Sequence, residues 1–209
     1  MSVRHVWMTA LATGAVLLTP LAAAGTASAA VHGSGKVTCF VQSGSGTLLP
    51  GLTPAGSPGG VKINFSGKLV TGQCSSAVTK PKGDQVTGGT FSGTGFYDSP
   101  PAGGPGSSCA NFDGPDVVGK ITVTINWTTT GVPIAPTVIT YASNPGTVSG
   151  SPTDTFLFTN APPGTATKSG SFASATTPAT VKLLTDLPGP TCGAGPFTTF
   201  NISNGTIKV

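Results

Sequence analysis

Apolar and polar residues alternate along two stretches of the chain. In residues 121–127 the odd positions are apolar and the even positions are polar, without a break. Residues 61–69 follow the same pattern, interrupted only at Gly67. A period of two is typical of a strand with one buried face. We therefore expect the face that ends at Trp127 to be part of a core, and Gly67 to mark a bulge or a close approach of two backbones.

Further short stretches rich in Val, Thr and Phe have the composition of strands. They are residues 37–41, 88–97, 137–141, 154–159, 170–173, 180–184, 197–202 and 206–209. Gly- and Pro-rich segments separate them. We expect a loop or an irregular hairpin at residues 43–60, a loop at residues 98–115 and a hairpin turn at Asn204-Gly205. Nine or ten short strands at this spacing predict a sandwich or a closed barrel. We favour an antiparallel β-sandwich, immunoglobulin-like or similar.

The composition supports an all-β fold and excludes one class of partner. The sequence contains no Glu, and its only Arg is Arg4, so good helix formers are scarce. Charged residues make up 8% of the chain, which carries a formal net charge of +4. The lysines are scattered, and no Arg accompanies them after residue 4. Nucleic-acid binding is therefore not expected.

The first 29 residues have the features of a secretory signal peptide. A positive start at Arg4 is followed by an apolar stretch and then by small residues at Ala27 and Ala29. We expect cleavage after Ala29 and a single domain over residues 30–209. The apolar stretch is rich in Ala and Thr and contains Pro20, which argues against a retained anchor. No later segment is expected to cross a membrane.

Four cysteines follow the predicted leader: Cys39, Cys74, Cys109 and Cys192. An even number in an exported chain predicts two disulfides. Three connectivities are available, and we favour Cys39–Cys74 because both cysteines lie on predicted strands near each other in the sequence. Cys109–Cys192 would then join two Gly- and Pro-rich loops.

A family resemblance rests on the same region. Val37-Thr38-Cys39, Pro50-Gly51-Leu52 and Gly72-Gln73-Cys74 follow a signal peptide in this order. In this the chain resembles a group of exported actinobacterial β-proteins without assigned activity. The resemblance covers the first third of the mature chain and implies a compartment and a fold, but no functional residue.

Candidates for catalysis and metal binding are few. After the predicted leader His32 is the only histidine, and it lies where chain ends usually fray, so a Ser-His-Asp triad or a zinc site is not expected. Most aspartates lie beside Gly- and Pro-rich turns, where Asp is common for its local hydrogen bonds. Asn111, Asp113 and Asp116 surround a Gly turn and are a candidate calcium site, weighed against an ordinary turn.

Two tyrosines are the candidate ligand contacts. Tyr97 and Tyr141 lie at predicted strand ends near loops. Four asparagines begin an N-x-Ser/Thr triplet, and in a Thr-rich chain of the bacterial origin that the resemblance implies, we expect no glycan there. They are Asn64, Asn126, Asn201 and Asn204.

The expected function follows from these exclusions. We expect a secreted protein, extracellular or associated with the cell surface, that is not an enzyme and needs no cofactor. It would bind an extracellular protein or polymer. The alternative is a secreted inhibitor of an extracellular hydrolase, with residues 98–115 inserted into the active site. A hydrolase that uses Asp alone is the third possibility.

Overall fold

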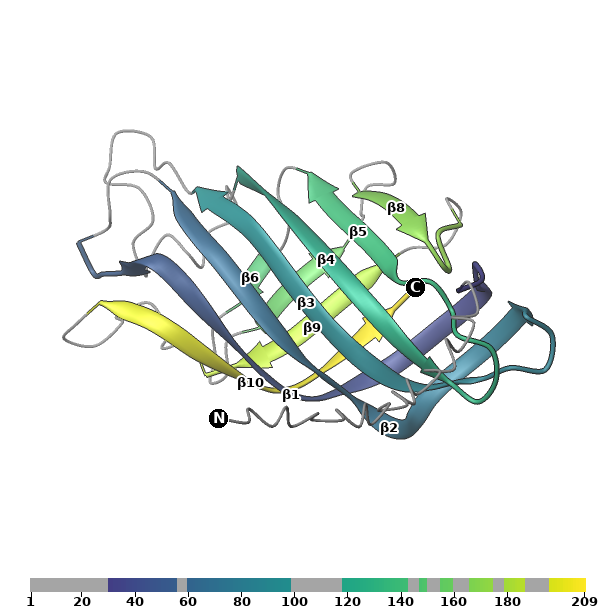
Figure 1. Cartoon of the computed structure of the whole chain (residues 1–209). Coiled ribbons are helices and arrows are strands. Elements are labelled where there is room, and N and C mark those ends of the chain that lie inside the picture. The colour runs from purple at the N-terminus through teal and green to yellow at the C-terminus, as the bar shows by residue number, and fades with distance from the viewer. Residues whose placement is uncertain are drawn as a thin grey trace, which may run out of the picture.

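The computed structural model is an all-β protein (Figure 1). It describes residues 30–55, 60–98, 118–142, 147–149, 155–159, 166–174, 179–186 and 196–209. Over these ranges the chain forms strands and turns but no helix, which confirms the predicted class. The strands are β1 (Ser34–Leu52), β2 (Val61–Lys80), β3 (Val86–Asp98), β4 (Val118–Thr129), β5 (Thr137–Ala142), β6 (Thr147–Ser149), β7 (Thr155–Thr159), β8 (Ala166–Gly170), β9 (Thr180–Thr185) and β10 (Phe197–Lys208).

All ten strands belong to one antiparallel sheet, in the order β6-β7-β9-β10-β1-β2-β3-β4-β5-β8. Within the described residues no ladder joins β6 to β8, so the sheet is not closed. Figure 1 shows β6 and β9 behind β3 and β4, because the sheet curls around its core. The expected division into the two sheets of an immunoglobulin-like sandwich is therefore not observed. Long strands that bend at bulges let a single sheet cover both sides of the core.

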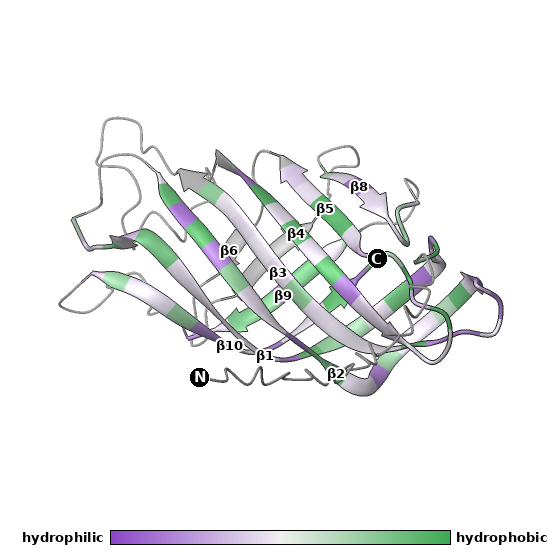
Figure 2. Cartoon of the chain, in the orientation of Figure 1, coloured by the Kyte–Doolittle hydropathy of each residue, from purple (hydrophilic) through white to green (hydrophobic). Residues whose placement is uncertain are grey.

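The predicted alternation is confirmed on the central strands. Ile63 and Val123 are fully buried, whereas their neighbours Lys62 and Asn64 are exposed. The same alternation appears as bands of opposite hydropathy along β2 and β4 (Figure 2). The inward side chains of β1, β2, β3, β4, β5, β9 and β10 form one hydrophobic cluster.

Inward glycines stand opposite aromatic rings in this core. Gly93 is paired with Phe65 across β2 and β3, and Gly67 is paired with Phe91 across the same two strands. A Cβ atom added to Gly93 would overlap the Phe65 ring, so the ring occupies the space that a side chain would take. The expected close approach at Gly67 is confirmed, since a Cβ there would meet the Phe91 ring and the Ser43 carbonyl oxygen.

The packing of glycine against rings also explains why residues 43–52 belong to a strand, where a loop or an irregular hairpin is expected over residues 43–60. Residues 43–52 continue β1, and the inward Gly46 lies opposite both Phe65 and Phe200. Gly46, a residue type that favours a loop from sequence, serves here as the small partner of large rings from neighbouring strands.

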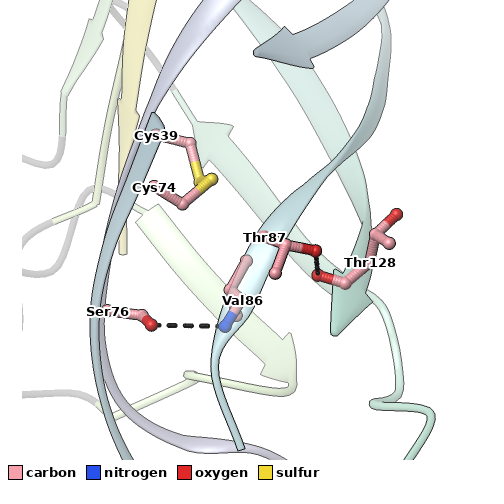
Figure 3. The surroundings of a disulfide bond; sticks show 6 residues. All are labelled: Cys39, Cys74, Ser76, Val86, Thr87 and Thr128. Atoms are coloured by element: carbon pink, nitrogen blue, oxygen red, sulfur yellow. Dashed lines mark hydrogen bonds between the residues drawn. A yellow bond between two sulfur atoms is a disulfide. The ribbon is translucent and has the colours of Figure 1, made fainter. Parts of the chain in front are cut away.

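An irregularity in the β1–β2 ladder lies beside the disulfide (Figure 3). Cys39 is paired with Cys74 and Val41 with Leu69, so residues 70–73 of β2 oppose Phe40 alone. Past this bulge β2 leaves the β2–β3 ladder, and Val86 N donates a hydrogen bond to Ser76 Oγ at 3.2 Å. The disulfide therefore fixes the register of β1 and β2 where bulged backbone would otherwise let it slip.

Two turn assignments also change. Asn204 and Gly205 do not form a hairpin: they lie within β10, where the ladders to β1 and β9 continue on both sides of a bulge. The strand expected at residues 170–173 lies earlier, as β8, and Ser171 and Phe172 form a turn. Backbone pairing to neighbours distant in sequence decides both cases, and local composition does not reveal it.

Candidate functional site

The outer face of the sheet carries two rows of small side chains, all of them polar except Val138, that cross seven strands. Residues directly opposite each other in an antiparallel pair point to the same face, so successive ladders define each row. The first row is Thr199, Thr47, Asn64, Thr94, Thr122, Thr140 and Thr167. The second row is Asn201, Ser45, Ser66, Ser92, Thr124, Val138 and Ser169. We call the two rows together the hydroxyl face.

Side chains of the hydroxyl face are exposed or half-buried throughout. Neighbours within the first row bind each other: Thr94 Oγ1 donates to Asn64 Oδ1 at 2.8 Å, and the hydroxyl oxygens of Thr122 and Thr140 lie 3.1 Å apart. These bonds hold side chains in fixed rotamers on a rigid scaffold. Hydroxyl groups both donate and accept hydrogen bonds, so the face is adapted to partners that carry hydroxyl or amide groups.

Three shallow depressions lie on the hydroxyl face. Each is lined by row side chains together with a directly opposed Gly–Phe pair of the sheet: Gly67 with Phe91, Gly93 with Phe65, or Gly46 with Phe65. The packing of core rings against glycines thus coincides with the hollows of the opposite surface.

A third outer row borders the face with charged and apolar side chains. Leu49, Lys62, Phe96 and Lys120 follow one another across β1, β2, β3 and β4. Leu49 is 67% exposed and Phe96 is 48% exposed, and both lysines are exposed. On the opposite border Lys68 lies across from Thr90, which lies across from Asn126. The hydroxyl face is therefore flanked by lysines on both sides.

Tyr97 and Tyr141 are the residues expected to contact a ligand, and the structure does not place the Tyr141 side chain on the hydroxyl face. Tyr141 lies at the end of the β4–β5 ladder, as predicted, but its side chain is 1% exposed and belongs to the core. Burial raises the pKa of its hydroxyl well above the usual value. Tyr97 lies in β3 opposite Val61 and Gly119, and its side chain lies outside the described part of the structure.

The cysteine prediction is confirmed for one bridge. Cys39 and Cys74 form a disulfide with Cα atoms 4.1 Å apart. Cys109 and Cys192 lie outside the described residues, and their pairing stays a prediction. The candidate calcium residues Asn111, Asp113 and Asp116 also lie outside, as do residues 99–115 of the loop on which the inhibitor alternative depends.

His32 is exposed, but its surroundings are not frayed as expected. Val31 N donates to Pro133 O at 3.1 Å, and Phe172 N donates to Gly33 O at 2.7 Å. The chain on both sides of His32 is therefore held by the body of the protein. Hydrogen bonds to segments that are distant in sequence hold this part of the chain in place.

Two aspartates bind backbone that is distant in sequence, in place of the local hydrogen bonds expected for turn residues. Asp84 Oδ2 accepts a hydrogen bond from Val132 N at 3.0 Å, and Asp186 Oδ1 accepts one from Asn201 N at 2.6 Å. Each carboxylate joins two segments of backbone. Over the part of the chain that the structure describes, no three His, Cys, Asp or Glu side chains gather as a metal site would need.

Trp127 is confirmed as a core residue at 9% exposure. Its indole Nε1 donates to Thr137 Oγ1 at 2.8 Å, and its ring meets Phe172 edge-on with centroids 5.5 Å apart. A buried Trp requires a hydrogen-bond partner for its indole N–H, and Thr137 provides that partner here.

No family model, curated protein or solved structure matches the chain. In the described ranges, no helix has the length and apolar character needed to cross a membrane. The hydroxyl face is therefore assigned from its own geometry.

Sequence reasoning missed the hydroxyl face, although part of its signal is visible in the sequence. Thr90, Ser92 and Thr94 alternate on one strand, and Thr122 and Thr124 alternate on the next. The sequence does not show the strand register that joins such residues into continuous rows across the sheet.

Proposed function

We propose that the protein is an exported, non-catalytic binding protein and that the hydroxyl face binds an extracellular polymer. The observation that carries this proposal is the continuity of the two rows over β10, β1, β2, β3, β4, β5 and β8. The Cys39–Cys74 disulfide supports export, because such bonds persist in oxidising compartments.

The chemistry of the face favours a polymer with many hydroxyl or amide groups. A single hydroxyl contact contributes little net free energy, since it replaces a contact with water. A ligand that repeats the same group along its length makes many such contacts at once, and its affinity grows through their number. Rows of similar side chains at the strand spacing of about 4.8 Å suit such a repeating ligand.

The curvature of the sheet favours a flexible chain as the ligand. Neighbouring strands of a sheet rotate by about 20–25° relative to each other, so a row that crosses seven strands follows a twisted path. A flexible chain follows that path, whereas a flat crystalline surface contacts only a few strands.

The test compares the protein with a variant that lacks central hydroxyl groups. Thr94→Val with Thr122→Val removes two hydroxyls of the first row and keeps the side-chain shape and the β propensity. Thr128→Val with Thr198→Val is the matched control, since both threonines are exposed and lie outside the rows. Binding is measured by affinity electrophoresis in gels that contain soluble polysaccharides.

We expect retardation of the protein and of the control, and weaker retardation of the row variant. The same protein should not shorten any of the polymers on incubation. Retardation of none of the proteins, equal loss in control and row variant, or cleavage of a polymer would refute the proposal.

A further inference from the structure

Exposed lysines recur among the charged side chains on the outer side of the sheet. Six exposed lysines each lie next to a buried residue of their strand or at an outward position of that strand. They are Lys36, Lys62, Lys68, Lys120, Lys182 and Lys208. Asp186 supplies a carboxylate on this side, where it is bound to the backbone and side chain of Asn201 in the second row. Asp98 ends β3, and its side chain lies outside the described part of the structure.

The lysines nearest the hydroxyl face have a defined arrangement. Lys62 and Lys120 lie on either side of Phe96 in the same outer row, so two strand spacings, about 10 Å, separate their Cα atoms. Lys62 and Lys68 lie six residues apart on β2, which corresponds to about 20 Å. The hydroxyl rows at Asn64 and Ser66 cross β2 between these two lysines.

Phe96 adds an apolar contact between the charges. Its ring is 48% exposed, and a Cβ atom added to Gly60 would overlap that ring. The ring therefore rests on the Gly60 backbone, and in the outer row its residue lies between Lys62 and Lys120. Such a ring can contact the apolar face of a sugar while its neighbours contact acidic groups.

We infer that the polymer bound by the hydroxyl face is an acidic polysaccharide, in which Lys62, Lys68 and Lys120 contact carboxylate or sulfate groups and Phe96 contacts a sugar ring. This inference rests on the proposed function and names its ligand class. Charge complementarity carries it: lysines border the rows on both sides, and the rows themselves contain no carboxylate.

The experiment uses polygalacturonate, chondroitin sulfate and fully methyl-esterified polygalacturonate as probes. The ester has the same backbone as the first probe but lacks its charges. The variant Lys62→Gln, Lys68→Gln, Lys120→Gln is compared with Lys36→Gln, Lys80→Gln, Lys82→Gln, which changes the net charge equally. All six lysines are exposed, and the control set lies away from the rows.

We expect the acidic polymers to bind and the ester to bind about tenfold more weakly at low salt, because three solvated ion pairs together contribute about 1.4 kcal/mol. The first lysine variant should lose about the same factor, and its affinity should depend less steeply on salt. The control variant should bind as the unchanged protein does. Phe96→Ser should weaken binding without changing the salt dependence.

Two results would overturn the inference and leave the proposed function standing. In the first, the ester binds as tightly as the acidic polymers. In the second, the two lysine variants lose affinity equally, while Thr94→Val with Thr122→Val still weakens binding. Tighter binding of a single-stranded DNA oligonucleotide than of any polysaccharide would overturn the choice of ligand class. Failure of every polymer to bind would refute the proposed function itself.

Discussion

Trp127 donates its indole N–H to the hydroxyl of Thr137, at 2.8 Å, across the β4–β5 ladder. The hydroxyl of Thr137 in turn donates to the carbonyl oxygen of Ser171, in the turn that follows β8. Both side chains are buried, so this short chain of hydrogen bonds ties three segments together inside the core.

Removal of the Trp127 side chain or of the Thr137 hydroxyl should destabilise the protein, and the two losses should differ in size. Trp127→Ala should lower the free energy of unfolding by about 3–5 kcal/mol, because it removes a large core side chain. Thr137→Val keeps the shape but leaves a buried donor and a buried acceptor without a partner, at about 1–3 kcal/mol. Chemical denaturation measures both. Intrinsic fluorescence provides a check, since emission of Trp127 as in free aqueous tryptophan would contradict its burial.

The Cys39–Cys74 bridge should be recoverable chemically. Cleavage after lysine under non-reducing conditions separates the two cysteines at Lys62 and Lys68, so a linked pair of peptides identifies the bridge. Cys39→Ala with Cys74→Ala should lower the free energy of unfolding by about 4 kcal/mol in the chain-entropy model for a separation of 35 residues. A peptide that joins Cys39 to Cys109 or Cys192 would contradict the structure.

Glycine in the core should be intolerant of even one methyl group where a ring covers it. Gly93→Ala should cost about 1–3 kcal/mol, because the added Cβ overlaps Phe65. Gly88→Ala on the same strand is the control: its added Cβ meets its nearest neighbour, the Thr71 Cα, at 3.5 Å, an ordinary contact. In Gly93→Ala, the additional change Phe65→Leu should restore part of the lost stability. Equal effects of the two alanine substitutions would argue against the Gly–Phe packing.

Tyr141 should make stability depend on pH in the alkaline range. Burial raises the pKa of its hydroxyl above the value of 10.0 that applies to the unfolded chain. The neutral form is therefore favoured by folding, and the stability it contributes is complete below pH 10 and lost as the pH rises further. In Tyr97→Phe, Tyr141 is the only remaining tyrosine. Its ionisation, followed by absorbance near 295 nm, should coincide with unfolding, and a simple titration centred at about pH 10 in a folded protein would contradict this.

The sequence predicts the parts of this fold that depend on local alternation. Residues 61–69 and 121–127 are strands with the expected buried faces, because a period of two is written directly in the chain. A loop or an irregular hairpin is expected at residues 43–60, but residues 43–52 continue β1, since the role of Gly46 depends on Phe65 and Phe200, which are distant in sequence. The turn that Asn204-Gly205 predicts is not formed, because pairing with distant strands decides the structure there as well.

The candidate site was less accessible to sequence reasoning than the core. Tyr141 was chosen because it ends a strand, but only the packing shows that its side chain turns inward. The rows of the hydroxyl face arise from registers between seven strands, and no single stretch of sequence contains them. Single-strand patterns such as Thr122 and Thr124 indicate an outward polar face and nothing about its extent.

The place of β10 has a consequence for how the chain matures. β1, the first strand, is bonded on one side to β2 and on the other to β10, the last strand. During synthesis or translocation from the N-terminus, one edge of β1 therefore stays open until β10 emerges, and an open edge readily pairs with other chains. Without β10, Thr199 and Asn201 are also missing from the two rows. Copies of the chain in which β10 is not yet in place therefore carry an open edge that favours their aggregation, and the pairing of β10 with β1 closes that edge.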